Sequence, residues 1–338
     1  MGGPAVLALR TICRIGEDDT LHTNINYRNA AADIAWGFRN FFNRPEVTCL
    51  LRGLNRGVVY WQRVLEYSTE GGLQSVLDEY FHILREALRI TNLRSEKSLN
   101  DLVTSVLASL QLITARIDID TFNHLSIKKE SMRGHFTLRF GIQESEDGGM
   151  EPTREDRVRQ AFNSPFWPFV LASTSVGQEG LDFHQYCHAI IHWNLPSNPV
   201  DLEQREGRIH RYKGHAVRKN IAEQYAHVLK NLSIQDPWEQ MFSEAVKDHG
   251  PGSRGLSPFW NFPQGSARVE RYVPALRFSR DQIKLFALKK SLAIYRMVFG
   301  QSRQEDLVNY LLQHLPEEEI QYISEQLKMD LSAPYSEL

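Results

Sequence analysis

Hydrophobic positions in the first 125 residues recur at the spacing of helices. Between residues 72 and 88, apolar side chains follow one another at steps of three and four: Leu73, Val76, Leu77, Tyr80, Ile83 and Leu84. This spacing places them on one face of a helix. Further helices are predicted over 30–42, 58–67 and 99–114, and the β-branched run 113–119 predicts a strand. We expect residues 1–125 to be mainly helical, with that strand as a displaced part of a later sheet.

The pattern changes between residues 126 and 232. Polar and apolar residues alternate over 135–140, as in a strand, and 153–162 has the pattern of a helix. Two compact apolar runs follow, at 169–172 and 188–193. Short apolar runs that alternate with helices are typical of parallel strands buried on both faces. This region therefore predicts an α/β fold, with a parallel sheet sandwiched by helices.

Helical patterns return over residues 233–338. Ser279 and Gln282 form a capping-box pattern ahead of an apolar helix face, and Ser302 with Glu305 begins another helix. Pro316 stands where a first-turn proline is tolerated. The stretch 250–265, which is rich in Gly, Pro and Ser, is expected to form a loop. The chain is thus expected to divide into 1–125, 126–232 and 233–338.

Composition narrows the class of protein. With 338 residues, of which 42% are hydrophobic and 24% charged, the chain can bury the cores of two or three units. Its 39 basic and 41 acidic side chains nearly cancel, so any binding to nucleic acid has to come from a local patch. Three distant cysteines favour a reducing cytoplasm over a disulfide framework. No apolar run approaches the ~18 residues of a membrane span, and the N-terminus has no leader pattern.

Residues 169–219 contain the candidate chemistry. The first apolar run is followed by small hydroxyl residues and glycines: Ser173, Thr174, Ser175, Gly177 and Gly180. Such residues at the end of a strand bring backbone amides close to phosphates, although an ordinary strand-to-helix turn has the same composition. Residues 203–219 contain six Lys or Arg and only two Glu. Arg208 and Arg211, three residues apart, are expected on one helical face, where both could reach one phosphate; a solvated basic helix is the alternative.

The segments STSVGQEGLDF and QREGRIHR together resemble motifs V and VI of the second RecA-like lobe of superfamily 2 helicases and translocases. The resemblance is strongest to the Swi/Snf-type branch. The fixed positions of motif VI, Q-x-x-G-R-x-x-R, are filled by Gln204, Gly207, Arg208 and Arg211. The flanking segments are also similar, so the resemblance covers residues 153–213. Asp182 departs from the Swi/Snf pattern, which commonly has Asn there, and matches the DEAD-box pattern.

This resemblance implies roles for individual residues. Arg208 and Arg211 would be arginine fingers that reach the γ-phosphate of ATP across a cleft between two lobes. Gln204 and Gly207 would couple the nucleotide state to closure of the lobes, together with the motif V turn of Gly177, Gly180 and Asp182. The nucleic-acid backbone would be contacted by five residues: Ser173, Thr174, Ser175, Arg205 and Lys213.

The first lobe of such a motor has no counterpart in the sequence. A P-loop, Gly-Lys-Ser/Thr, which would hold the phosphates of ATP with Mg²⁺, does not occur. Asp78 and Glu79 mimic an acidic box, but they lie within a helical pattern and follow no apolar strand. We therefore expect two partners: nucleic acid, with DNA favoured over RNA, and a separate P-loop-bearing first lobe or upstream polypeptide. The chain alone is expected to be inactive.

The alternative hypothesis is a non-catalytic module for binding nucleic acid or protein, derived from a helicase lobe. No metal site is expected, because a strand at 188–193 makes His188 and His192 packing residues although His184, His188 and His192 are spaced by four. Trp193, Trp238 and Trp260, with Trp167, are expected in the core. We expect a cytoplasmic protein that has no contact with membranes.

Overall fold

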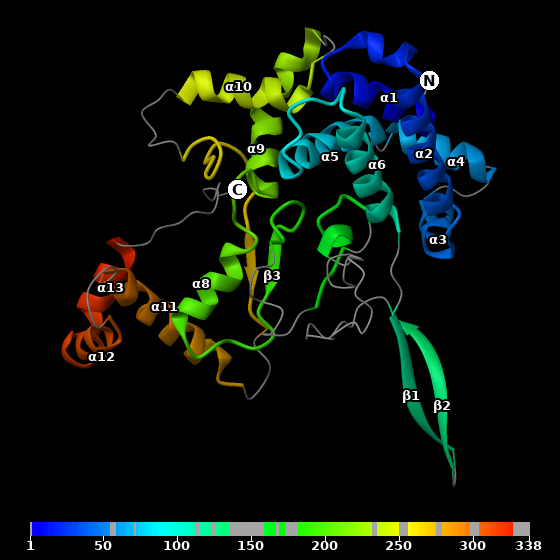
Figure 1. Cartoon of the computed structure of the whole chain (residues 1–338). Helices are drawn as coiled ribbons and strands as arrows, with labels where there is room; N and C mark the ends of the chain where they lie inside the picture. Colours follow the sequence, from blue (N-terminus) through cyan, green and yellow to red (C-terminus); the bar gives the residue numbers. More distant parts are fainter. Residues whose placement is uncertain are drawn as a thin grey trace. The chain divides into compact units, whose positions relative to one another are not determined.

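The computed structural model describes residues 2–54, 59–70, 72–111, 115–123, 126–134, 159–166, 169–172, 182–231, 235–249, 256–274, 279–297 and 304–326. The chain packs as two units (Figure 1). Unit 1 comprises Met1–Tyr186 and Tyr225–Asp248, and unit 2 comprises Cys187–Gln224 and His249–Leu338. The domain boundaries predicted after residues 125 and 232 stay a prediction. None of the described helices has the length and apolar character to cross a membrane.

Helices make up most of the described part of unit 1. In chain order they are α1 (Pro4–Ile15), η1 (Asp19–Thr23), α2 (Ile25–Phe42), α3 (Pro45–Leu54), α4 (Tyr60–Glu70), α5 (Leu73–Ala87), α6 (Glu96–Leu110), η3 (Ala226–Asn231) and α10 (Pro237–His249). The helices predicted from periodicity in residues 1–125 are confirmed as α2, α4, α5 and α6. The sequence patterns did not predict α1 and α3.

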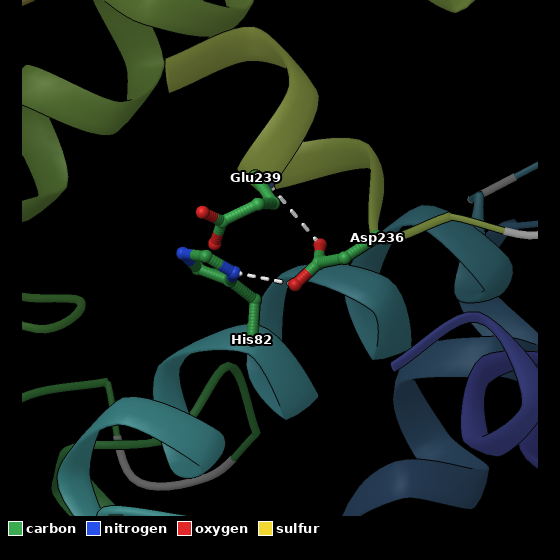
Figure 2. A group of neighbouring side chains, drawn as sticks. All are labelled: His82, Asp236 and Glu239. Carbon is green, nitrogen blue, oxygen red and sulfur yellow. Dashed lines mark hydrogen bonds and ion pairs between the residues drawn. The ribbon is translucent and has the colours of Figure 1, made fainter. Parts of the chain in front are cut away.

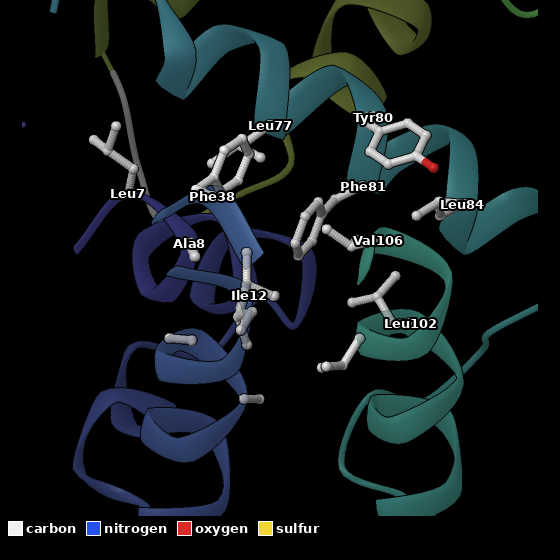
Figure 3. Close-up of a cluster of buried hydrophobic side chains, with 14 of the residues drawn as sticks. Leu7, Ala8, Ile12, Phe38, Leu77, Tyr80, Phe81, Leu84, Leu102 and Val106 are labelled. Atoms are coloured by element: carbon white, nitrogen blue, oxygen red, sulfur yellow. The ribbon is translucent and has the colours of Figure 1, made fainter. Parts of the chain in front are cut away.

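The core of unit 1 lies among α1, α2, α5 and α6 (Figure 3). Ile12 of α1, Phe81 of α5 and Leu102 of α6 are fully buried there, and Phe38 of α2 is 1% exposed. Local signals support these helices. Pro4 begins α1, where its missing N–H costs nothing, and Asn24 caps α2 by accepting a hydrogen bond from Asn26 N at 2.9 Å.

The sequence that mimics an acidic box lies in this core. Asp78 is buried in α5, where its carboxylate accepts a hydrogen bond from Thr11 Oγ1 at 2.8 Å and pairs with Arg14. Burial raises the pKa of Asp78, and the charge of Arg14 partly offsets that effect. Asp78 therefore joins α5 to α1, and the acidic pair lies within a helix, as its pattern predicts.

Two antiparallel strands follow the N-terminal helices. They are β1 (Ala115–Asn123) and β2 (Ser126–Gly134), with Ala115 opposite Gly134 and Asn123 opposite Ser126. The strand predicted at 113–119 is confirmed as β1. Within the described residues it pairs with β2 and takes no part in the parallel sheet, so its prediction as a displaced strand of that sheet is not borne out. The predicted strand at 135–140 lies outside the described residues.

Unit 2 contains a small parallel sheet and five helices among its described residues. The sheet pairs β3 (Ala189–Ile191) with β4 (Glu270–Tyr272), and Ile191 lies opposite Tyr272. The helices are α8 (Pro199–Gly207), α9 (His215–Tyr225), α11 (Asp281–Met297), α12 (Gln304–His314) and α13 (Glu317–Gln326). Leu195, Leu202 and Leu288 form a buried cluster that joins α8 to α11.

The described structure is mostly helical with one small parallel sheet, as expected for an α/β RecA-like lobe flanked by helical regions. The fold class is thereby confirmed. Two details differ from the prediction. Residues 169–172 form no strand, and Phe169 and Val170 are exposed. Ile191 of β3 is also 62% exposed, so β3 is not buried on both faces in the described structure. A short apolar run alone does not identify a neighbouring strand that would cover it.

Several predictions for the last third are confirmed. Ser279 Oγ accepts a hydrogen bond from Asp281 N at 3.4 Å, at the start of α11. The helix predicted from Ser302 is α12, and Pro316 comes immediately before α13, where its carbonyl accepts a hydrogen bond from Ile320 N at 3.1 Å. Residues 256–265, the described part of the predicted loop, contain no helix or strand.

Candidate functional site

Helix α8 carries the first half of motif VI. Asn198 caps it by accepting a hydrogen bond from Val200 N at 2.9 Å, and Pro199 occupies its first position. Leu202, fully buried, fixes one face of the helix on the cluster with Leu195 and Leu288. Gln204 and Gly207 are exposed, and a Cβ added at Gly207 would meet no atom of the described residues within 4 Å. Among the described residues, this end of α8 is therefore open.

The two candidate arginine fingers lie just beyond the helix. Because α8 ends at Gly207, Arg208 and Arg211 are not on one helical face, contrary to the expectation from their spacing. Arg208 is half-buried at the C-cap, whereas Arg211 is exposed and its Nε donates to the Gly207 carbonyl at 3.1 Å. We call residues 208–211 the arginine-bearing turn. Ile209 N and His210 N both donate to the carbonyl of Glu206, at 3.0 and 3.1 Å, and so fix this turn to α8.

Lys213, a predicted nucleic-acid contact, is 8% exposed. Its φ is 48°, in the left-handed region that is costly for side chains other than glycine. Two hydrogen bonds to the backbone of Lys213 maintain this conformation: its N–H donates to Phe259 O at 2.8 Å, and its carbonyl accepts from the Arg218 side-chain Nη1 at 2.7 Å. Lys213 Nζ is 5.7 Å from the ring centroids of both Tyr212 and Phe259. Its charge therefore lies against aromatic rings.

Arg205 is the other predicted nucleic-acid contact in motif VI. Its side chain is half-buried, and Nη1 donates to the Asn194 carbonyl at 2.9 Å. One edge of the guanidinium thus holds α8 against the segment that follows β3.

Glu206 was not among the predicted site residues. Its carboxylate hydrogen-bonds to His192 Nε2 at 3.1 Å and to both Arg271 Nε, at 2.5 Å, and Arg271 Nη2. Burial would raise the pKa of Glu206, but the hydrogen bonds and charges of His192 and Arg271 hold it below its ordinary value. A single acidic residue within a basic motif was the signal available in the sequence.

The motif V residues Ser173, Thr174, Ser175, Gly177 and Gly180 lie outside the described residues, as does Trp167. Asp182, the described end of this motif, is half-buried in unit 1. Its backbone carbonyl accepts a hydrogen bond from Asn163 Nδ2 at 2.6 Å. The predicted roles of these residues stay predictions.

The spaced histidines do not converge. His188 is exposed and its ring centroid lies 5.4 Å from that of His215, whereas His192 is buried against Glu206. Burial, followed by the charges of Arg218, His188 and Lys219, lowers the pKa of His215 to about 4. Of the tryptophans expected in the core, Trp238 is buried, but Trp193 is 71% and Trp260 43% exposed, so the expectation is wrong for these two.

One group of side chains in the described residues has the spacing of a metal site. Ligand atoms of His82, Asp236 and Glu239 lie within 4.8 Å of one another in unit 1 (Figure 2). His82 and Asp236 have fully buried side chains, and His82 Nδ1 is 2.7 Å from Asp236 Oδ2. Arg85 Nη2 lies 2.8 Å from Glu239 and 3.6 Å from Asp236.

The contacts of this group favour an ion-pair network over a metal centre. Arg85 already supplies a cation beside both carboxylates. Asp236 Oδ1 caps α10 by accepting a hydrogen bond from Trp238 N at 2.9 Å. Burial opposes ionisation of Asp236, but His82, the charge of Arg85 and the Trp238 N–H together outweigh it and lower the pKa below the ordinary value. The network fixes α10 on α5. The His82 ring also stacks on the Phe242 ring, with 6.3 Å between the ring centroids.

Comparison with known proteins defines the class. Residues 135–213 match the family described as the helicase conserved C-terminal domain. Together with motif VI at the end of α8, this match supports a helicase C-terminal lobe within residues 135–213, similar to that of superfamily 2 proteins. The resemblance predicted from motifs V and VI is confirmed.

Individual relatives are similar over part of the chain. The "Uncharacterized ATP-dependent helicase YqhH" of Bacillus subtilis is 41% identical over 64 residues, which are 19% of this chain and 11% of that protein. "RNA polymerase-associated protein RapA" of Pseudomonas fluorescens is 32% identical over 130 residues, 38% of this chain and 12% of that protein. The chain therefore matches about a tenth of the length of these relatives. No solved structure gives a significant match.

Proposed function

We propose that this chain supplies the second RecA-like lobe of an ATP-dependent nucleic-acid helicase or translocase. The observation that carries the proposal is the arginine-bearing turn at the open end of α8, within a helicase C-terminal domain. Arg211 is exposed on this turn and Arg208 caps the helix. The name of the Bacillus relative, an ATP-dependent helicase, supports the use of ATP.

In this function, Arg208 and Arg211 are the arginine fingers. Guanidinium groups present fixed positive charge and several N–H donors, which stabilise the negative charge that develops on the phosphate oxygens during transfer. A P-loop-bearing first lobe holds most of ATP and Mg²⁺, because this sequence has no Gly-Lys-Ser/Thr. Gln204 and Gly207, both exposed beside the turn, couple the nucleotide to lobe closure.

The nucleic-acid side of the proposal rests on motif V and its neighbours. Ser173, Thr174 and Ser175 contact the phosphate backbone, with DNA as the favoured nucleic acid, and Gly177, Gly180 and Asp182 link this contact to the nucleotide. Arg205 adds the positive charge of a half-buried guanidinium on α8. Lys213 contributes positive potential from its aromatic surroundings more than a direct contact, since it is 8% exposed. None of the three cysteines, all of which the structure describes, forms a disulfide, which supports a cytoplasmic location.

The test is ATP turnover by the chain assembled with a P-loop-bearing first lobe encoded beside it. Arg208→Gln and Arg211→Gln should each lower kcat by about 10³-fold, the order of magnitude lost with an arginine finger. Arg28→Gln is the matched control, because Arg28 is exposed on α2 in unit 1. The chain alone should hydrolyse ATP at background rate. ATP turnover that is indifferent to both arginines in every assembly would overturn the proposal.

The lack of a P-loop sequence also favours a second candidate, a non-catalytic nucleic-acid-binding module. Such a module would bind DNA through the basic segment 203–219, with an affinity that falls steeply as salt rises. DNA affinity measured with and without ATP, in the presence of the first lobe, separates the two. The DNA affinity of a motor changes with its nucleotide state, whereas that of a passive module does not.

A further inference from the structure

We propose that Glu206 is a positioning residue for the arginine fingers, and that Arg271 and His192 act through it. The inference rests on the proposed function, because it concerns how Arg208 is held for contact with ATP. Glu206 is bound at both ends. Its carboxylate is fixed to the sheet of unit 2, and its backbone carbonyl is fixed to the arginine-bearing turn.

The carboxylate of Glu206 is held by a residue of β4 and by the residue that follows β3. Arg271 lies in the middle of β4 and binds Glu206 with two guanidinium nitrogens, Nε and Nη2, one to each carboxylate oxygen. Such bidentate pairs restrict direction as well as distance. His192, whose side chain is 1% exposed, comes directly after β3, and its backbone N–H donates to Tyr272 O of β4 at 2.9 Å. Both partners of Glu206 therefore belong to one hydrogen-bonded sheet.

The carbonyl end is held by the turn. Ile209 N and His210 N donate to the Glu206 carbonyl, and Arg208 is the residue that precedes this pair. Ile209 is 5% exposed, so the turn cannot move without disturbing buried packing. A shift of the Glu206 side chain therefore shifts the backbone that carries Arg208. Since a displacement of ~1 Å in a catalytic group can cost 10²-fold in rate, this connection matters for ATP turnover.

The strength of the contact follows from its charge. Burial opposes ionisation of Glu206, but the cation of Arg271 and the hydrogen bond of His192 keep the carboxylate charged, with its pKa below the ordinary value. The Glu206 side chain is only 20% exposed, which limits screening by water. Arg271→Lys would keep the positive charge and lose the bidentate geometry, so it should retain only part of the wild-type ATP turnover.

The experiment compares Glu206→Gln, Arg271→Gln, the double variant and Arg271→Lys in the assembly with the first lobe. We expect kcat for ATP to fall about tenfold in each Gln variant, with KM for ATP within about twofold of wild type. The double variant should be no slower than either single one, because both remove the same contact. The kcat of Arg271→Lys should lie between that of the Gln variants and that of wild type. Arg280→Gln, an exposed arginine of unit 2, is the control.

Unfolding by urea, followed on the same variants, separates positioning from mere stability. A loss of stability with wild-type kcat in the folded fraction of Glu206→Gln and Arg271→Gln would overturn the inference. In that case Arg208→Gln still abolishes turnover, and the proposed function stands. If Arg208→Gln leaves turnover unchanged, the proposed function itself fails. Arg271→Lys keeps the test informative should Arg271→Gln fold poorly, since it retains the positive charge.

Discussion

Within each unit, the described contacts differ in the balance of apolar and polar groups. Unit 1 has a broad buried cluster of apolar side chains from α1, α2, α5 and α6. In unit 2 the described apolar cluster of α8 and α11 is small, and polar contacts are prominent around Glu206, Lys213 and Asn220. Apolar packing is non-directional, whereas hydrogen bonds and ion pairs fix direction. Unit 2 therefore has the kind of contacts that can set the position of a guanidinium.

Asn220 illustrates the difference. It is 1% exposed, and its Nδ2 donates to the carbonyls of Phe262 and Ala267 at 3.1 and 3.0 Å. Its Oδ1 accepts a hydrogen bond from Ala267 N at 2.8 Å. One amide thereby fixes the segment after residue 256 to α9, the helix that follows motif VI. In unit 2 a buried amide joins two segments of the chain. In unit 1 the helices are joined mainly by leucine and phenylalanine side chains.

The largest effect should come from the apolar core. Phe81→Ala should lower the free energy of unfolding by about 4 kcal/mol, because it removes a fully buried ring and leaves a cavity. Urea unfolding measures this directly. Trp36→Ala is the control, since Trp36 is 60% exposed and its loss should cost less than about 1 kcal/mol. Equal costs at the two positions would contradict the view of unit 1 as a body held by its core.

Local spacing predicted the elements of unit 1 well, because each helix buries one face on the same core. The omission of α1 shows a limit. Leu7, Ala8, Thr11, Ile12 and Ile15 have helical spacing and are buried, although no helix was predicted for this segment. The run 169–172 shows the converse, since its apolar residues predicted a strand and Phe169 and Val170 are exposed. The composition of an apolar run does not show whether another element packs against it in the folded protein.

The site could be predicted only as far as it is contiguous. Motif VI gave Gln204, Gly207, Arg208 and Arg211 from their fixed spacing. It did not give Arg271, which lies 65 residues after Glu206 and meets it only when β4 pairs with β3. The His82–Asp236 contact spans 154 residues. Such pairs depend on the tertiary fold and leave no periodic signal in the sequence.

The second prediction tests the polar contact within unit 1. Asp236→Ala should lower the free energy of unfolding by about 3 kcal/mol, because it removes both a helix cap and the partner of buried His82. Asp236→Asn should cost less, since an amide oxygen still caps α10. Thermal or urea unfolding of both variants gives the comparison. If both cost less than about 0.5 kcal/mol, α10 is held on α5 by apolar packing alone.

The direction of the pH dependence sharpens this prediction. The pKa of Asp236 is lowered in the folded protein, so its stabilising contribution is present above the pKa of about 3.9 of an unfolded aspartate. That contribution is lost as the pH falls below this value. The unfolding free energy of Asp236→Asn should therefore fall less steeply than that of wild type as the pH drops below about 3.9. An equally steep fall in both proteins would show that His82 does not hold the carboxylate in its charged form.

The smallest effect should come from His215 in unit 2. Its pKa is lowered to about 4 in the folded state, so between pH 6.5 and about 4 the unfolded chain binds a proton that the folded chain does not. Stability rises with pH wherever the unfolded state binds more protons, so this contribution is complete above pH 6.5 and is lost as the pH falls. Between pH 7 and pH 5 the loss amounts to about 2 kcal/mol.

His215→Gln removes the titration and should flatten the dependence of the unfolding free energy on pH between 7 and 5. The control is His227→Gln, because His227 is exposed. The cause of the shift lies first in burial and then in the nearby cations of Arg218 and Lys219. High salt screens the cations and leaves burial unchanged, so a slope that persists at high salt assigns the effect to burial. A slope that His215→Gln leaves intact would place the acid sensitivity of unit 2 elsewhere and weaken the contrast between its polar contacts and the apolar core of unit 1.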